Sequence, residues 1–307
     1  MILTKSFLAG LFLLVSLNQE AVSADLDDEF SRQEIYSWIR FNEDNDFALP
    51  QNFTFPGDAR KESTFGVDFS HHNIDSCHCK IDWDSISQQG VKFVYIKATQ
   101  GASYVDPQYE PNEEAIAAAG IDRGAYHFLT AADAPDDQWQ NFLGATKIAL
   151  PLPPALDLEW DAGPMQANCK NDAIIEIRKA NGDVTRRCDK WSFVKSSDIV
   201  AMANAWLDAA KAFTGQEPVL YTSAAWWAAR IAKSFEDSGI HAKIVWTADY
   251  TKNGRLTEKP RSPGGSEWLL WQFTDGAKVP HGKEVARLDA SIFQGSRDEF
   301  RSAIGYK

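Results

Sequence analysis

Two carboxylates spaced two positions apart, Asp157 and Glu159, are the residues of this sequence best suited to do chemistry. They lie in the apolar segment Ala155–Glu159, which is typical of a buried strand. Side chains two apart on a strand share a face, so we expect both carboxylates on one side, with Leu156 and Leu158 on the other. Mutual repulsion and burial raise one pKa, which leaves a protonated acid beside an ionised carboxylate. Glycoside hydrolysis needs this pair, because the leaving oxygen must be protonated while positive charge develops on the sugar.

Structural roles are the alternative for these and other residues. Asp157 and Glu159 could instead form ion pairs with Lys97 or Arg123, since such networks also perturb carboxylates. His127 is predicted to be a hydrogen-bonded residue rather than a catalytic base, because carboxylates are available for acid–base work. Trp226-Trp227 is predicted to pack as a helix face rather than to bind sugar.

The carboxylates need a scaffold, and short apolar runs alternating with helix-like segments predict one. The expected strands cover residues 65–68, 93–97, 124–128, 155–159, 219–221, 244–246, 269–272 and 285–289. Helices are expected over 111–120 and 197–213, the second with an apolar stripe from Ile199 to Phe213. Eight such strands favour an α/β fold, a parallel barrel of the TIM-like type. Beyond Trp246 there is little room for helices, so we expect an irregular barrel with fewer helices in its C-terminal part.

Polar residues end these runs, and in such a barrel the strand ends meet at one rim, where the active site lies. They are Asp68, Lys97, His127, Asp157, Glu159, Tyr221, Asp249, Gln272 and Asp289. An acidic cluster at that rim is therefore predicted.

In this order the motifs resemble those of glycoside hydrolase family 25, the N-acetylmuramidase type of lysozyme. The resemblance runs from about residue 65 to 293. It is carried by Gly66–Ser70, Ile81–Trp83, Phe93–Gly101, Asp106, Asn112, Gly124–Phe128, Pro154–Glu159, Tyr221–Ser223, Trp271–Phe273 and Leu288–Asp289.

The resemblance implies hydrolysis of the β-1,4 bond between N-acetylmuramic acid and N-acetylglucosamine in peptidoglycan. Glu159 is implied as the general acid and later base, and Asp157 as the group that stabilises the acetamido group or the developing positive charge. Asp68 and Asp289 would complete the acidic floor. The implied sugar-binding residues are Tyr126, Tyr221, Trp246, Gln272 and Lys97. The resemblance implies that the anomeric configuration is retained, by a substrate-assisted or a covalent route. It implies no metal and no other cofactor.

Two departures from the family pattern concern single residues. The family usually has Asn two residues after the C-terminal Asp, whereas Ala290 and Ser291 follow Asp289 here. The role of Asp249 is left open. Two rival functions also stay open: a non-catalytic module that binds peptidoglycan, and a hydrolase of another N-acetylated glycan such as chitin.

The N-terminal residues predict export. Lys5 precedes the apolar run 7–17, and the small residues 21–24 suit cleavage, so residues 1–24 are expected to be a signal peptide. The protein is then secreted or periplasmic. Residues 25–63 form an acidic N-terminal extension with helical spacing over 29–41, and residues 64–307 form the glycoside hydrolase barrel.

The four cysteines, Cys77, Cys79, Cys169 and Cys188, are expected to form disulfides in an oxidising compartment. Asn181-Gly182 signals a hairpin, and a Cys169–Cys188 bridge across its base is geometrically sensible. A Cys77–Cys79 bridge or a crossed pairing stays open. The hairpin, near 165–190, is predicted to be an insertion that forms one wall of the substrate groove.

Metal binding is the alternative for the first two cysteines. Soft ligands crowd this segment: His71, His72, Cys77, His78 and Cys79. Disulfides are favoured over zinc, and no metal site is predicted.

The composition limits the possible partners. The chain has 307 residues and a net charge of −12, which argues against nucleic acid and anionic membranes because both attract basic surfaces. No segment beyond the signal peptide approaches the length of a membrane span. Its 11 Trp, 8 Tyr and 18 Phe suit both a core and stacking on sugar rings. We expect a monomer that acts on peptidoglycan glycan strands.

Overall fold

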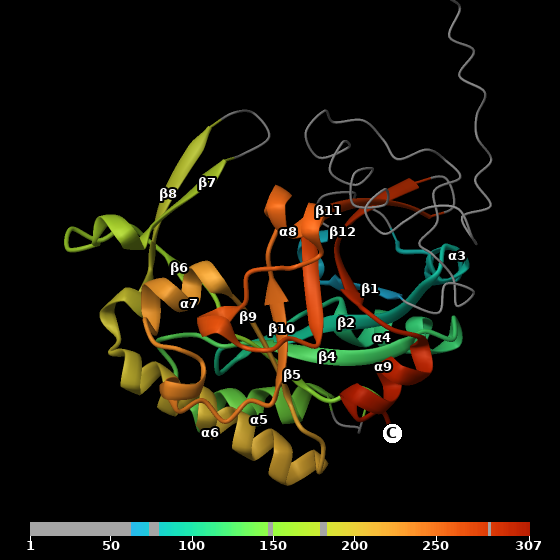
Figure 1. The fold of residues 1–307 in the computed structure, drawn as a ribbon, viewed down its shortest axis with the longest axis horizontal. Coiled ribbons are helices and arrows are strands. Elements are labelled where there is room, and N and C mark those ends of the chain that lie inside the picture. Colours follow the sequence, from blue (N-terminus) through green and yellow to red (C-terminus); the bar gives the residue numbers. More distant parts are fainter. Residues whose placement is uncertain (1–62, 74–79, 147–149, 179–182, 282–283) are drawn as a thin grey trace, which may run out of the picture.

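A computed structural model describes residues 63–73, 80–146, 150–178, 183–281 and 284–307 (Figure 1). The predicted signal peptide, the helical spacing over 29–41 and the residues Cys77, His78 and Cys79 lie outside the described residues.

Eight strands close into a barrel in the part of the chain that the structure describes, as the sequence predicted. Around the ring the order is β1, β12, β11, β10, β9, β5, β4 and β2, and β2 pairs with β1 to close it. These strands are β1 (Thr64–Phe69), β2 (Val91–Gln100), β4 (Asp122–Phe128), β5 (Ala155–Asp157), β9 (Val219–Ser223), β10 (Ile244–Ala248), β11 (Leu270–His281) and β12 (Glu284–Phe293). The two-residue strand β3 (Tyr104–Val105) pairs with the end of β2.

Helices cover the barrel unevenly. They are α3 (Trp83–Gln88), α4 (Tyr109–Ala118), α5 (Pro135–Thr146), α6 (Ser196–Thr214), α7 (Ala224–Arg230), α8 (Lys252–Thr257) and α9 (Arg297–Ile304). Short 3₁₀ turns are η1 (Asn171–Ala173), η2 (Lys190–Phe193), η3 (Glu236–Ser238) and η4 (Pro263–Gly265). The long helices α5 and α6 precede β9, whereas α7 and α8 have only 7 and 6 residues. The predicted shortage of helices in the C-terminal part is confirmed.

The expectation of a fully parallel barrel is wrong for one strand. β12 runs antiparallel to both of its neighbours, β11 and β1. Only residues 282–283 separate β11 from β12. A parallel neighbour needs a crossover of a dozen or more residues, whereas so short a connection joins antiparallel strands.

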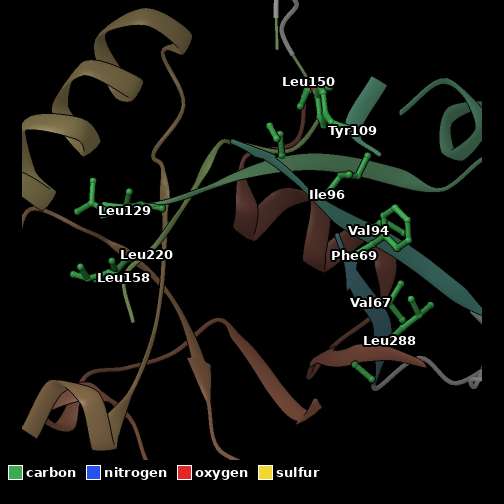
Figure 2. Packing of buried hydrophobic residues seen from close by; sticks show 14 of the residues in the cluster. Val67, Phe69, Val94, Ile96, Tyr109, Leu129, Leu150, Leu158, Leu220 and Leu288 are labelled. Carbon is green, nitrogen blue, oxygen red and sulfur yellow. The ribbon is translucent and has the colours of Figure 1, made fainter. Parts of the chain in front are cut away.

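Leucines on the outer faces of the strands pack under the helices. Leu129, Leu158 and Leu220 lie together in Figure 2, and all are fully buried. Trp206 of α6 covers this region and packs edge-on against Trp139 of α5, with ring centroids 5.4 Å apart. The predicted stripe of α6 is therefore confirmed except at Phe213, which is 63% exposed because the last turn of the helix reaches only the edge of this core.

Glycines make room for aromatic rings inside the barrel. A Cβ on Gly66 would lie 2.3 Å from the Phe93 ring, and one on Gly124 would lie 2.5 Å from the Tyr95 ring. The ring of Phe300 in α9 stacks on the ring of Phe93, with the two ring centroids 4.7 Å apart. These aromatic rings pack inside the barrel on the side of α9.

A separate three-stranded sheet projects from the barrel next to α7 (Figure 1). It consists of β6 (Ala162–Gly163), β8 (Val184–Asp189) and β7 (Ile174–Arg178), all antiparallel. The predicted bridge Cys169–Cys188 is present, with the Cα atoms 6.0 Å apart. We call this unit the hairpin and its residues Ala162, Asp189 and Lys190 the hairpin root. Among the described residues, no helix has the length and apolar character needed to span a bilayer.

Candidate active site

One pocket opens at the carboxyl ends of the parallel strands. Its lining consists of Asp68, Tyr126, Asp157, Glu159, Tyr221, Trp246, Gln272 and Asp289. All eight were predicted from the sequence, four as the acidic group and four as sugar-binding residues. Seven different strands or strand ends contribute them, so the closed barrel brings distant parts of the chain together.

Strand alternation explains how the carboxylates enter the pocket. Asp157 is the last residue of β5 and Glu159 follows two residues later, while Leu156 and Leu158 are fully buried on the helix side. Asp289 lies directly opposite Asp68 in the β1–β12 pairing. An antiparallel β12 therefore still brings its carboxylate to the level of the other acids.

Gln272 organises one side of the pocket. Its Nε2 donates to Asp68 Oδ2 at 2.7 Å, and its Oε1 accepts from the Tyr221 hydroxyl at 2.8 Å. The Tyr250 hydroxyl donates to the same Oε1. Tyr250 was not among the predicted site residues, although it lies one residue beyond Asp249 and its hydroxyl reaches this group. In contrast, Asp157 Oδ1 is buried without a hydrogen-bond partner among the described residues.

Burial and mutual repulsion raise the pKa of every acid in the pocket. Burial raises the pKa of Glu159 to about 7, with the positive charge of Lys97 opposing the rise and Asp275 adding to it. Burial, together with Asp275 and Glu159, raises the pKa of Asp289 to about 8. The pKa values of Asp68 and Asp157 are also raised, chiefly by burial and then by Asp289 and Glu159 respectively. Glu159 can therefore hold a proton near neutral pH, as a general acid must.

A wider groove extends from this pocket. We call it the outer groove, and its further lining residues include Lys97, Phe128, Trp160, Lys190, Asp275 and Arg287. Lys97 is only 5% exposed, and burial lowers its pKa. Its ammonium donates to Gln100 Oε1 at 2.8 Å and lies 4.9 Å from the centre of the Phe128 ring. The predicted substrate residue Lys97 thus lines the outer groove rather than the inner pocket.

Reasoning from the sequence missed four of these groove residues. Trp160, Lys190, Asp275 and Arg287 lie outside the strand-end positions on which the prediction depended. Asp275 belongs to the long strand β11, whose register shifts between Gln272 and Ala277. Such bulges re-aim side chains, so simple alternation could not have found it.

Of the two cations in the ion-pair alternative, Lys97 acts on the pocket acids, since its positive charge opposes the rise in the pKa of Asp157 and of Glu159. Arg123 pairs with Glu113 instead of with the pocket acids. Asp249 does not line the pocket either: its carboxylate accepts from the backbone N–H of Arg261 at 2.8 Å and from Thr251 Oγ1 at 3.1 Å. Its open role is therefore a structural one at the start of the loop that contains α8.

Two further predictions concern buried side chains. His127 is hydrogen-bonded through Thr99 Oγ1 at 2.7 Å and Gln138 Oε1 at 3.1 Å, and burial lowers its pKa to about 4. Trp226 and Trp227 are buried in α7, as the helix-face interpretation expected.

Cys77, His78 and Cys79 of the metal alternative lie outside the described residues, whereas His71 and His72 belong to the described part of the chain. No group of three or more metal-binding side chains occurs there. His71 Nδ1 lies 2.7 Å from Asp106 Oδ2, which gives this imidazole a carboxylate partner.

Residues 67–281 match the sequence family described as "Glycosyl hydrolases family 25". The chain belongs to this family. It is therefore a glycoside hydrolase, as the motifs predicted. Among family 25 relatives it is 28% identical to lysozyme M1 of Streptomyces globisporus over 247 residues, 78% of this chain and 71% of that protein. It is 24% identical to an N,O-diacetylmuramidase of Arthroderma benhamiae, over 80% of this chain and 88% of that one.

The fold is shared with solved structures of the same family. A family 25 glycosyl hydrolase from Bacillus anthracis superposes with a TM-score of 0.59 at 22% identity, covering 79% of this chain and 94% of the other. Family 25 membership thus agrees with the irregular eight-stranded barrel described above.

Proposed function

We propose that this family 25 enzyme is a muramidase that hydrolyses the β-1,4 bond between N-acetylmuramic acid and N-acetylglucosamine in peptidoglycan. The observation that carries the proposal is the pairing of Glu159, whose pKa burial raises to about 7, with Asp157 in one aromatic-lined pocket. The names of the similar lysozyme and muramidase support the choice of substrate.

Glu159 acts first as an acid and then as a base. Its proton passes to the glycosidic oxygen as the bond from C1 of the muramic acid to that oxygen breaks. In the second step the Glu159 carboxylate takes a proton from water, whose oxygen then bonds to C1. A pKa near neutrality suits both steps, because the group must give up and regain a proton in each turnover.

Asp157 binds the acetamido group of the sugar. Its Oδ1 is a buried acceptor that lacks a partner among the described residues, and an N–H donor from the substrate would satisfy it. That contact turns the acetamido oxygen toward C1, to which it bonds as the glycosidic bond breaks. The bond between C1 and the acetamido oxygen then breaks as the water oxygen bonds to C1, which completes a retaining, substrate-assisted reaction. The carboxyl groups of Asp68 and Asp289 complete the floor of the pocket, and in their ionised form they favour the positive charge that develops on the sugar.

Export and a monomeric state complete the proposal. The signal-like residues 1–24 and the Cys169–Cys188 bridge support secretion or a periplasmic location, where disulfides persist. The reaction as written uses only the side chains of the pocket and water, so we assign no metal or organic cofactor to it.

Digestion of purified peptidoglycan tests the proposal. The protein lacking residues 1–24 should release fragments whose reducing ends are muramic acid, identified by mass analysis after borohydride reduction. Glu159→Gln should lower the rate by about 10²- to 10⁴-fold, the usual contribution of a general acid. Glu236→Gln, at an exposed carboxylate that lines neither the pocket nor the outer groove, is the matched control.

Three outcomes would contradict the proposal. Glucosamine at the reducing ends would mean that the enzyme cleaves a different bond of peptidoglycan. Activity only on chitin would mean that its substrate is a different polymer. An unchanged rate for Glu159→Gln would remove Glu159 from the reaction.

A further inference from the structure

Trp160 follows the proposed acid directly and lines the outer groove. The guanidinium carbon of Arg230 lies 5.2 Å from the centre of its ring, so a cation packs against one side of the indole. The Trp160 side chain is partly buried and packs against the hydrophobic core. An indole held in this way leaves a fixed apolar surface toward the groove beside Glu159.

The Arg230 side chain is itself held by the hairpin. Its Nε donates to Asp189 Oδ2 at 2.5 Å, and its Nη2 donates to the backbone oxygen of Asp172 at 3.2 Å. The two side chains of this ion pair are only 4% and 0% exposed. A buried arginine with fixed partners has little freedom to leave the ring that it covers.

Asp189 also holds the chain beside Trp160. Its Oδ1 accepts from the backbone N–H of Asp161 at 3.0 Å. The Asp161 side chain in turn accepts from the backbone N–H of Ala131 at 3.0 Å and from Lys190 Nζ at 2.9 Å. The segment that follows Glu159 is thus tied to the barrel through Ala131 and to the hairpin root through Asp189 and Lys190.

We propose that Trp160 stacks on a sugar ring of the bound glycan next to the cleaved bond, and that Asp189 and Arg230 are positioning residues that fix its indole. The C–H face of a pyranose is apolar, and a fixed aromatic face binds it at little entropic cost. The hairpin therefore contributes to substrate binding through its root; of its described residues, Ala162 and Lys190 line the groove. This inference rests on the proposed function for the identity of the glycan.

Binding of peptide-free peptidoglycan glycan chains to the Glu159→Gln protein tests the stacking role without turnover. Adding Trp160→Ala should weaken binding, measured by calorimetry, by about three- to tenfold, and Trp160→Phe should recover most of the loss. In the active enzyme Trp160→Ala should raise KM more than it lowers kcat, because a stacked sugar is held in both the ground and transition states. A merely structural role would lower kcat through loss of folded enzyme.

Arg230→Lys tests the positioning role. It keeps a charge opposite Asp189 but removes the flat guanidinium from the indole, so KM should rise at a temperature where circular dichroism shows the variant to be fully folded. Glu176→Gln is the matched control, since it breaks the exposed hairpin ion pair with Arg186 and leaves the root intact.

Each result decides one part of the inference. Unchanged glycan affinity for Trp160→Ala overturns the stacking role. If Trp160→Ala weakens glycan binding but Arg230→Lys leaves KM unchanged, only the positioning role is overturned. If the parent enzyme does not cut peptidoglycan but Trp160→Ala still weakens glycan binding, the proposed reaction is overturned and the stacking role of Trp160 is supported. If the Glu159→Gln protein does not bind the glycan at all, the stacking role is overturned whether or not the parent cuts.

Discussion

Asp275 is an exposed residue of β11 whose negative charge acts on the proposed acid. Its carboxylate raises the pKa of Glu159 and of Asp289, while Lys97 opposes the rise at Glu159. Asp275→Asn removes that negative charge, so the pKa of Glu159 should fall. The basic limb of the profile of kcat/KM against pH reports the acid of the free enzyme and should move to lower pH.

The control for this shift is Glu267→Gln, which removes an equal charge from an exposed position. A basic limb that stays in place in Asp275→Asn, or moves equally in Glu267→Gln, would show that Asp275 does not act on Glu159 specifically.

Gln272 is the polar residue on which the pocket depends most for stability. Gln272→Leu removes the donor to Asp68 and the acceptor of the Tyr221 hydroxyl, and leaves both groups buried. An unsatisfied buried polar group costs about 1–3 kcal/mol, so we expect a loss of that size in the free energy of unfolding. Urea unfolding measures it, with exposed Gln140→Leu as the control. A loss no larger than that of the control would mean that these groups find other partners.

At the scale of elements, the hairpin should depend on its disulfide and the barrel should not. The Cys169–Cys188 bridge spans 19 positions, and closing a loop of this length stabilises by about 3 kcal/mol. The hairpin strands pair with one another and not with the barrel sheet. In a protein with Cys169→Ser and Cys188→Ser, trypsin should therefore cut after the exposed Arg186 while the barrel stays intact.

Mass analysis of the tryptic fragments checks this prediction, and the parent protein with its bridge intact is the control. Equal cleavage rates at Arg186 in both proteins would mean that strand pairing alone orders the hairpin.

The strands and most of the pocket were accessible from the sequence because apolar runs and period-two spacing report directly on a barrel wall. Leu156 and Leu158 on one face, with Asp157 and Glu159 on the other, followed from spacing alone. The direction of β12 could not be predicted from its apolar run, because such a run is the same for a parallel and an antiparallel strand. Only the short connection to β11 determines that β12 is antiparallel.

The sequence also could not specify which groups form hydrogen bonds or ion pairs with a given charged side chain. Asp249 follows the last residue of β10, and Asp68 lies near the end of β1. The Asp249 carboxylate, however, accepts a hydrogen bond from the backbone N–H of Arg261, 12 residues along the chain, and so stabilises a loop. Arg123 is likewise taken by Glu113 of α4. Such choices depend on loop geometry, and a single sequence contains no pattern that reports it.

At the scale of the whole molecule, the buried acids should make stability depend on pH. The pKa of Glu159 is raised from 4.5 to about 7 and that of Asp289 from 3.8 to about 8. The folded state therefore binds protons more tightly than the unfolded chain, and this contribution is complete at low pH. As pH rises from about 4 to 8 the unfolded state gains charge first, so the contribution is lost.

The melting temperature measures this dependence. We expect it to fall as pH rises from about 5 to 8, and to fall less steeply in Asp289→Asn, which carries no titrating group at that position. Exposed acids with lowered pKa values, such as Glu299, which accepts from Ser296, lose their contribution only at more acidic pH. A melting temperature that rises across this range in the parent would contradict the prediction.

The meeting of the first and last barrel strands has a consequence for how this enzyme is made. Thr64 pairs with Phe293, and its hydroxyl donates to the backbone oxygen of Gly295, 231 positions along the chain. Contacts so distant in sequence form late in folding. A nascent chain that stops short of β12 presents two unpaired strand edges, on β1 and β11, and lacks Asp289 altogether. The ring and its acidic floor are completed by the same barrel strand, so this glycoside hydrolase acquires its pocket only once the chain has been synthesised through β12.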